Sequence, residues 1–384
     1  MVLERCREYS IPLILGVIIS LIWTNVSIES YHHFIHTPIF FNIDFHFLIN
    51  DIFMVFFFAI AGVEILNSLS RGGALNPIRK AVTPLMATAG GVIGPIFTFF
   101  ILNYFFGSDE YINGWGICTA TDIALAWLLA RIVFGKKHPA VSFLLLLAVA
   151  DDAIGLIIIA VFYSDPTEPV KPLWLLLIVV GMLIAWTLNR KRVKSYVPYI
   201  FGAGTIVWIG MYAAHLHPAL SLVFIVPFLP KKGVSTELID MHGVNDAPIH
   251  TTLNKFEHQI SPLVDYGLIF FGISNAGVEL SQISKLTWIV FASLVIGKTI
   301  GISLFTCHAV LLKFKLPEGM RAKDVFLTGL IGGLGLTVAL FVASEAYSDV
   351  SLQGSAKMGA LFTIFLFIFV IALGKIMRIK KIDN

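Results

Sequence analysis

The sequence predicts an all-helical membrane protein that crosses the bilayer twelve times. Of its 384 residues, 57% are hydrophobic and 13% are charged, whereas a soluble globular domain usually carries about 25% charged residues. The mean hydropathy is +0.85, and long apolar runs recur along the whole chain. Lipid is therefore the main solvent of this chain. Its net charge of +3 gives no indication of a nucleic-acid partner.

The apolar runs are long enough to span a membrane, which takes about 20 residues of helix. No run resembles a soluble domain, so we expect one transmembrane domain over residues 1–384, with a single long polar connection at 231–261. The first run lacks a small-residue cleavage site after it, and we interpret it as a span rather than a leader. The predicted spans, of which the eighth is short, are 11–26, 45–69, 81–106, 114–133, 140–163, 173–189, 196–214, 217–229, 262–280, 288–312, 325–346 and 358–377.

Lysine and arginine gather in alternate loops, which is the usual mark of the cytoplasmic side. If the N-terminus is cytoplasmic, 23 of the 27 basic residues fall on the inside. Only Lys171, Lys285 and Lys357 fall in outside loops, where acidic residues such as Glu110 accompany them. We therefore expect both termini in the cytoplasm. The remaining basic residue, Lys298, lies in the middle of the tenth span.

Ionisable residues in the middle of a span are costly, and they persist where they face a partner, water or an ion. Asp151 and Asp152 lie halfway along the fifth span, and Asp122 lies in the fourth. Lys298 is ten residues into its span, about 15 Å of helix, which is too far for its side chain to reach the interface. Other ionisable residues lie near span ends, where capping a helix or reaching the interface explains them equally well: Asp51, Glu64, His217 and Asp265.

A purely structural role for the adjacent aspartates is unfavourable, because neighbouring carboxylates repel each other. Consecutive residues point about 100° apart around a helix, so one carboxylate can face a cavity while the other faces Lys298. Carboxylate oxygens, helped by threonine hydroxyls and backbone carbonyls, suit Na⁺ or Li⁺ and offer nothing to a soft metal. The three cysteines are scattered and form no metal-ligand spacing, so no cofactor is expected.

Two spans carry signs of a broken helix, which in transporters marks a binding site at the midplane of the bilayer. The fourth contains the polar run Thr119-Ala120-Thr121-Asp122, whose side chains can bond freed backbone groups. The eleventh contains GLIGGLGLT, with four glycines where a helix interior normally avoids them. Close packing through small residues would explain the glycines alone, but it would not explain the run at 119–122.

At these residues the chain resembles the NhaA family of bacterial sodium/proton antiporters. The similarity covers nearly the whole length and keeps several independent motifs in order. The motifs are LINDIFMVFFFAIAGVE with Asp51 and Glu64, TATDIA with Thr121 and Asp122, the pair Asp151-Asp152, FFGISNAGVEL, IGKTIGISLF with Lys298, and GLIGGLGLT.

The resemblance implies a secondary transporter, not an enzyme, that exchanges Na⁺ or Li⁺ for H⁺ electrogenically across the bacterial inner membrane, for sodium and pH homeostasis. It also implies inverted repeats, roughly 81–163 and 288–377, with discontinuous helices 4 and 11 crossing at the bilayer midplane. Members of the family commonly dimerise through a periplasmic hairpin, for which the segment 31–46 is the candidate here.

The resemblance also assigns roles to residues. Asp152 would be the main carrier of ions and protons, and Asp151 would either join it or pair with Lys298. Thr121 would lend an oxygen ligand, and Asp122 would compensate the helix ends at the crossing. Positions that match the family near the funnels, with a possible part in the pH response, are Glu64, Glu257, His258, His217 and Asp51.

The sequence departs from the family pattern after Glu64, and two other functions would require different residues. After Glu64 the chain reads Ile-Leu-Asn-Ser-Leu where the family tends to carry a mixed charged run, so we expect a shifted or broadened pH dependence. A proton-coupled carrier of an organic anion would favour a basic cavity, whereas this midplane has three carboxylates and one lysine. An intramembrane aspartyl protease would set its aspartates in YD and GxGD, but Asp122 and Asp151 follow Thr and Ala.

Overall fold

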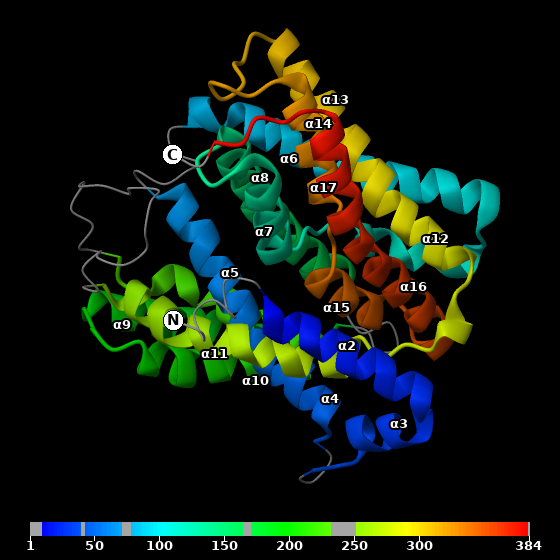
Figure 1. The fold of residues 1–384 in the computed structure, drawn as a ribbon. Coiled ribbons are helices and arrows are strands. Elements are labelled where there is room, and N and C mark those ends of the chain that lie inside the picture. The colour runs from blue at the N-terminus through cyan, green and yellow to red at the C-terminus, as the bar shows by residue number, and fades with distance from the viewer. Residues whose placement is uncertain (1–9, 40–42, 71–77, 164–169, 232–250, 383–384) are drawn as a thin grey trace.

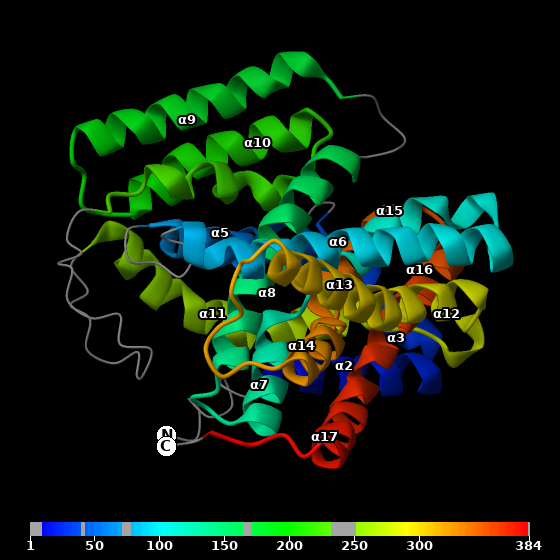
Figure 2. The ribbon, with the colours of Figure 1, turned by 90° about the horizontal axis from the view of Figure 1, so that it is seen from above.

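A computed structural model describes residues 10–39, 43–70, 78–163, 170–231 and 251–382, and this part of the chain contains helices and no strand element. The all-helical class expected from the composition is therefore confirmed for the described residues. Figures 1 and 2 show the helices in two groups, with α9 and α10 toward one side of the molecule and α12 and α16 toward the other.

The first group is built around α11, which packs against both α2 and α5. The helix α10 packs beside α9, and the 3-10 turn η5 (Pro218–Phe224) joins α10 to α5. The helices of this group are α2 (Ile11–Val26), α3 (Ile28–His36), α4 (Phe45–Phe47), α5 (Met54–Leu69), α9 (Leu175–Arg190), α10 (Thr205–Ala213) and α11 (Thr252–Asn275). Two π-helical turns, η1 (Leu48–Phe53) and η4 (Pro198–Gly204), lead into α5 and α10.

The second group contains α8, which carries the aspartate pair, and it packs on the first mainly through α8 and α5. Its closest helix pair is α6 with α13. The helices are α6 (Ile78–Phe106), α7 (Ile123–Phe134), α8 (Pro139–Phe162), α12 (Lys285–Ala292), α13 (Lys298–Leu311), α14 (Ala322–Gly332), α15 (Thr337–Ala346), α16 (Val350–Phe362) and α17 (Leu366–Ile376). The 3-10 segment η2 (Asp109–Cys118) precedes α7, and the π-helical turn η8 (Ser293–Gly297) joins α12 to α13.

Six helical runs among the described residues are long and apolar enough to cross a membrane, and two bent pairs raise this to as many as eight. The bent pairs are η2 with α7, at 58°, and α14 with α15, at 48°. They coincide with the fourth and eleventh predicted spans. The predicted spans at 11–26, 196–214, 217–229 and 262–280 are helical in the structure, but each is too short or too polar to meet the same criterion.

Two glycine pairs bring α6 and α13 into backbone contact. Gly90 and Gly94 lie four residues apart on α6, and Gly297 and Gly301 have the same spacing at the start of α13. A Cβ added to Gly301 would lie 2.0 Å from the carbonyl oxygen of Gly90, and one added to Gly94 would lie 2.3 Å from that of Gly297. Facing small-xxx-small pairs of this kind hold membrane helices together by close backbone packing. The pairing fixes the start of α13, where Lys298 lies.

The same three-residue sequence begins α8 and η5. His138-Pro139-Ala140 precedes α8, and His217-Pro218-Ala219 precedes η5. In each, the histidine Nδ1 accepts a hydrogen bond from the N–H of the alanine, at 3.1 Å and 3.3 Å. Proline suits the first helical position because its missing N–H would be unpaired there in any case. The capping nitrogen must be unprotonated, so each neutral ring carries its proton on Nε2.

Three predicted elements differ clearly from the structure. The helix α11 begins at Thr252 rather than 262, because the Thr251 hydroxyl caps the N–H of Asn254 and the first turns are polar. The helix α16 begins at Val350 rather than 358, because Asp349 caps it, accepting from the N–H groups of Ser351 and Leu352. A search for apolar runs cannot find helical turns that are polar.

The third difference concerns the segment 31–46. Residues 31–36 belong to helix α3 and 45–46 to α4, so both ends of the segment are helical, and a hairpin remains a prediction for the residues between them. Tyr31 and Ile35 are buried four residues apart on one face of α3. The N–H of Ile39 donates to the carbonyl of Ile43 at 2.8 Å; residues 40–42 lie outside the described part, as do 232–250 of the predicted long connection.

Candidate ion-binding site

The aspartate pair lies in the middle of α8, and both side chains are buried. Because consecutive helical residues point in different directions, the two carboxylates have different surroundings. The Asp151 carboxylate forms a salt bridge with the ammonium of Lys298 and accepts a hydrogen bond from the Thr121 hydroxyl at 2.8 Å. The contact between Asp151 and Lys298 is the arrangement that helix geometry allowed.

Lys298 is fully buried, and its Nζ also lies 2.6 Å from the Thr121 hydroxyl oxygen. Lysine, threonine and aspartate thus form a compact triangle that joins α13, the break before α7, and α8. A buried charge of this kind needs a partner of opposite sign, and Asp151 provides it. The glycine contacts between α6 and α13 hold the lysine at this depth.

The two bent pairs meet at their breaks. The Thr121 hydroxyl lies 2.8 Å from the carbonyl of Gly332, and the N–H of Asp122 donates to the carbonyl of Leu334 at 2.7 Å. The bond from Asp122 to Leu334 satisfies backbone groups that the interrupted helices leave free, while the single proton of the Thr121 hydroxyl goes either to the Gly332 carbonyl or to Asp151. The glycines of the eleventh segment serve close packing as well, since a Cβ on Gly333 would lie 2.9 Å from the carbonyl oxygen of Leu294.

A single carboxylate caps the first turns of both half-helices. The Asp122 Oδ1 accepts from the N–H of Leu125 in α7, at 3.1 Å. Its Oδ2 accepts from the N–H and the hydroxyl of Thr337, the first residue of α15, at 3.3 Å and 3.0 Å. The N-terminal end of a helix carries a partial positive charge. Asp122 therefore faces two such ends at once.

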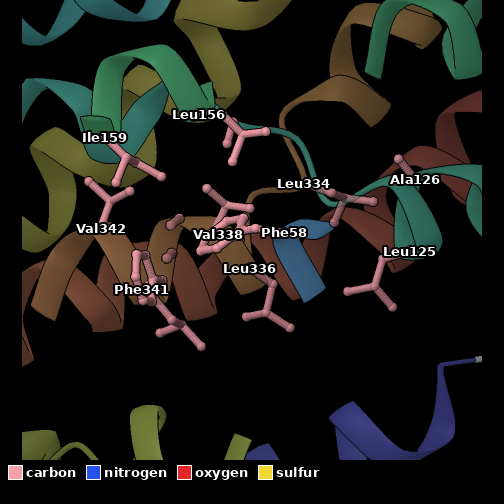
Figure 3. Packing of buried hydrophobic residues seen from close by; sticks show 14 of the residues in the cluster. Phe58, Leu125, Ala126, Leu156, Ile159, Leu334, Leu336, Val338, Phe341 and Val342 are labelled. Atoms are coloured by element: carbon pink, nitrogen blue, oxygen red, sulfur yellow. The ribbon is translucent and has the colours of Figure 1, made fainter. Parts of the chain in front are cut away.

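The environment of Asp152 is different. Its Oδ1, like that of Asp151, is buried and has no hydrogen-bond partner in the described part of the chain, but Asp152 does not share the Lys298 salt bridge that the other oxygen of Asp151 forms. The residue borders a cavity of about 10 Å³, the space of roughly one water-sized probe. The remaining lining is apolar: Phe57, Phe58, Ala61, Leu156, Ile159 and Val338. Figure 3 shows Phe58, Leu156, Ile159 and Val338 gathered in this region. Asp152 is thus a carboxylate with room beside it for one small occupant.

The other predicted positions lie away from this cluster. Glu257 on α11 accepts a hydrogen bond from Asn67 on α5 at 3.2 Å, and His258 is exposed. Glu64 is partly buried on α5, and an electrostatic interaction links it to Asp152. Asp51 interacts electrostatically with His217.

Sequence reasoning missed two charged residues at the far end of α15. Glu345 lies 3.3 Å from the His217 Nε2, in an ion pair or hydrogen bond according to the charge of the histidine. Lys357, which the loop count placed outside the membrane, is buried within α16 and interacts electrostatically with Glu345. Glu345 could have been identified from the sequence, because it is an acidic residue eight positions after Thr337 in an otherwise apolar helix.

The comparisons with known proteins all identify sodium/proton antiporters. The family model described as Na⁺/H⁺ antiporter 1 matches residues 2–373. The chain is 56% identical over 378 residues to the Na⁺/H⁺ antiporter NhaA of Desulfitobacterium hafniense (strain DSM 10664 / DCB-2), covering 98% of this chain and 96% of that one. It is 52% identical over 375 residues to the NhaA of Geotalea uraniireducens (strain Rf4), with the same coverage.

The fold also resembles that of a solved structure. The sodium proton antiporter MjNhaP1 from Methanocaldococcus jannaschii, determined at pH 8, superimposes with a TM-score of 0.54. The match covers 96% of this chain and 91% of that chain, at 15% sequence identity. At this identity the likeness concerns the fold alone.

Proposed function

Because the chain belongs to the Na⁺/H⁺ antiporter 1 family and is a multi-pass secondary transporter that exchanges Na⁺ for H⁺, we propose that the exchange takes place at Asp152. Na⁺ and H⁺ compete for its carboxylate, so neither binds while the other is present. Either load permits the switch between inward-facing and outward-facing states. The supporting observation is that Asp152 borders the small cavity with a buried Oδ1 that has no hydrogen-bond partner among the described residues, whereas Asp151, whose Oδ1 is also without a partner, holds Lys298 and Thr121 with its other oxygen.

The neighbouring residues supply the second titrating unit and the remaining ligands. In this proposal Asp151 holds the Lys298 ammonium while the site is empty, and the Thr121 hydroxyl lends an oxygen to the bound cation. Arrival of Na⁺ draws the Asp151 carboxylate away and releases a proton from Lys298. Two titrating units for one sodium ion make the exchange electrogenic. Li⁺, which prefers the same hard oxygen ligands, is carried as well.

The architecture proposed around this site has twelve spans, with inverted repeats at roughly 81–163 and 288–377. The discontinuous fourth and eleventh helices cross at the bilayer midplane, where Asp122 compensates both helix ends. We place the protein in the bacterial inner membrane with both termini cytoplasmic, as the distribution of lysine and arginine favours. We also propose a homodimer.

The residues near the two ends of the pathway are proposed to govern access and the pH response. Glu64, Glu257 and His258 lie toward the inner side, and Asp51 and His217 lie toward the outer side. The uncharged run after Glu64 supports a pH dependence that is shifted or broadened relative to the family.

The test is the variant Asp152→Asn, which keeps the shape of the side chain but cannot exchange charge for a proton. We expect it to fold and to lose Na⁺-driven proton flux in reconstituted vesicles. The matched control is Asp109→Asn, the same change at an exposed residue of η2, which should exchange normally. Normal Na⁺-dependent flux in Asp152→Asn would remove the carrier role from this residue. Proton flux that required an organic anion instead of Na⁺ would favour the other class of carrier.

A further inference from the structure

One face of α15 leads from the central cavity to the end of the helix at which α16 begins, the outer end in the proposed topology. Val338 borders the cavity beside Asp152. Phe341 and Glu345 follow at three and seven residues, the spacing that keeps side chains on one helical face. Seven residues of helix rise about 10 Å. Glu345 is the only ionisable residue in α15, so it is the first charged group of this helix along that face.

An aromatic pair separates the two carboxylates. The rings of Phe58 and Phe341 lie 5.2 Å apart in an edge-to-face arrangement, and Phe341 also contacts the His217 ring at 4.7 Å. Both phenylalanines are fully buried. Figure 3 shows Val338, Phe341 and Val342 along α15 with Phe58 beside them. A constriction lined in this way excludes water, so an ion passes only when the two rings separate.

Glu345 lies just beyond this constriction, in a mixed group of charges. Its closest partner, His217, uses Nδ1 to cap η5 and directs Nε2 at the Glu345 carboxylate. Lys357 on α16 and His46 on α4 also interact electrostatically with Glu345, and Asp51 of η1 faces both Glu345 and His217. Two carboxylates, one ammonium and two imidazoles therefore meet in this region, and the carboxylates can attract a cation.

A larger cavity adjoins this region. It measures about 230 Å³, which is room for several water molecules. Lys357 and His46 line it, together with the buried hydroxyls of Thr24 and Ser274, which have no hydrogen-bond partner among the residues that the structure describes. Buried hydroxyls without protein partners indicate ordered water. Lys357 and His46 thus link Glu345 to this cavity, and His217 links it to the aromatic constriction.

We propose that Glu345 is a further ion-binding carboxylate of the transport path. It takes up a monovalent cation or a proton at the outer face and exchanges it with Asp152 when Phe58 and Phe341 separate. His217 and Lys357 hold the carboxylate in place while it is empty. The proposal rests on the carrier role of Asp152 and on the proposed orientation of the chain.

The test compares the two faces of the membrane. The half-saturating Na⁺ concentration is measured with Na⁺ supplied to the outer face, in right-side-out vesicles, and to the inner face, in inside-out vesicles. We expect Glu345→Gln to raise the outer value about tenfold, equivalent to about 1.4 kcal/mol of binding free energy. The inner value should stay within about twofold of the unmodified protein. Glu345→Asp should recover most of the outer affinity.

The control is Glu110→Gln, which removes the same charge from an exposed outer residue of η2. An equal rise for Glu110→Gln would reduce the effect to the general surface charge and overturn the proposal. An equal shift at both faces, or none, would also overturn it, because a merely structural role does not distinguish the faces. If Glu345→Gln does not fold, Glu345→Ala, which also removes the carboxylate, takes its place with the same rise expected at the outer face alone. A failure of the proposed carrier role of Asp152 can be distinguished from a failure of this proposal, because Asp152→Asn affects transport measured from both faces.

Discussion

At the scale of single residues, the central site divides three carboxylates among three tasks. Asp122 receives the N–H groups of two helix starts, and one oxygen of Asp151 receives an ammonium while its Oδ1 has no partner; Asp152 borders the small cavity, and its Oδ1 also has no partner among the described residues. A buried carboxylate that is paired resists protonation and exchange, whereas an unpaired one changes its occupant readily. The division of partners therefore explains why two neighbouring residues of the same type can differ in function.

The pair of Lys298 and Asp151 allows a test of stability that is independent of transport. Removing one member of a buried ion pair usually costs about 3–5 kcal/mol, because the other charge is left without compensation. We expect Lys298→Ala to lower the Tm of the purified protein markedly. The double variant Asp151→Asn with Lys298→Gln, a neutral pair that can hydrogen-bond, should recover much of this loss. A double variant no more stable than Lys298→Ala would mean that Lys298 has another principal partner.

The sequence was informative about this cluster and identified only part of the outer one, namely Asp51 and His217. Asp151, Asp152 and Lys298 were identified because charge in the middle of a long apolar run has few explanations. Glu345 and Lys357 were missed because they lie beside polar residues, where the apolar run stops. Burial of Lys357 depends on the helical start at Val350, which Asp349 sets by capping and which no hydropathy pattern shows.

At the scale of elements, the glycines of α6 and α13 make a sharp prediction. A Cβ at Gly301 would lie 2.0 Å from the carbonyl oxygen of Gly90, a backbone atom that cannot move without moving the helix. We expect Gly301→Ala to lower stability by about 1–3 kcal/mol, as overpacking does. It should also reduce exchange, because α13 carries Lys298. Thermal unfolding and vesicle flux measure the two effects.

The matched control is Gly62→Ala in α5. Nothing lies within 4 Å of a Cβ added there, so the substitution brings only the better helix propensity of alanine. Its Tm should be unchanged or slightly raised. Equal losses in the two variants would show that the contact between α6 and α13 is not what makes Gly301 necessary.

The elements themselves were predicted well where they are apolar throughout. The spans predicted at 45–69, 81–106 and 140–163 match helical runs to within a residue or two. The breaks in the fourth and eleventh segments fall at the polar and glycine-rich runs that indicated them. The start of α11 was missed by ten residues, because its first turns carry Lys255, Glu257 and His258 rather than apolar side chains.

At the scale of the whole molecule, the orientation of the chain is open to a labelling experiment. Lys191, at the end of α9, is expected to face the cytoplasm, and Glu110, in η2, the outside. Single cysteines at these two positions, after replacement of Cys6, Cys118 and Cys307, should react with an impermeant reagent from opposite faces. Labelling from the same face would refute the number of spans between them.

The shared cap at Asp122 has a consequence for how the molecule moves. A helix start that loses its capping side chain gives up about 0.5–2 kcal/mol. Pulling α7 and α15 apart would strip the cap from at least one of them, so the low-cost displacement carries both half-helices together as a rigid body. The pair of α7 and α15 would then slide against α5, α11 and η5. The contacts at that boundary are aromatic rings and a few polar bonds. A cysteine cross-link between α7 and α15 should therefore leave turnover intact, whereas one between α15 and α11 should stop it until the link is reduced.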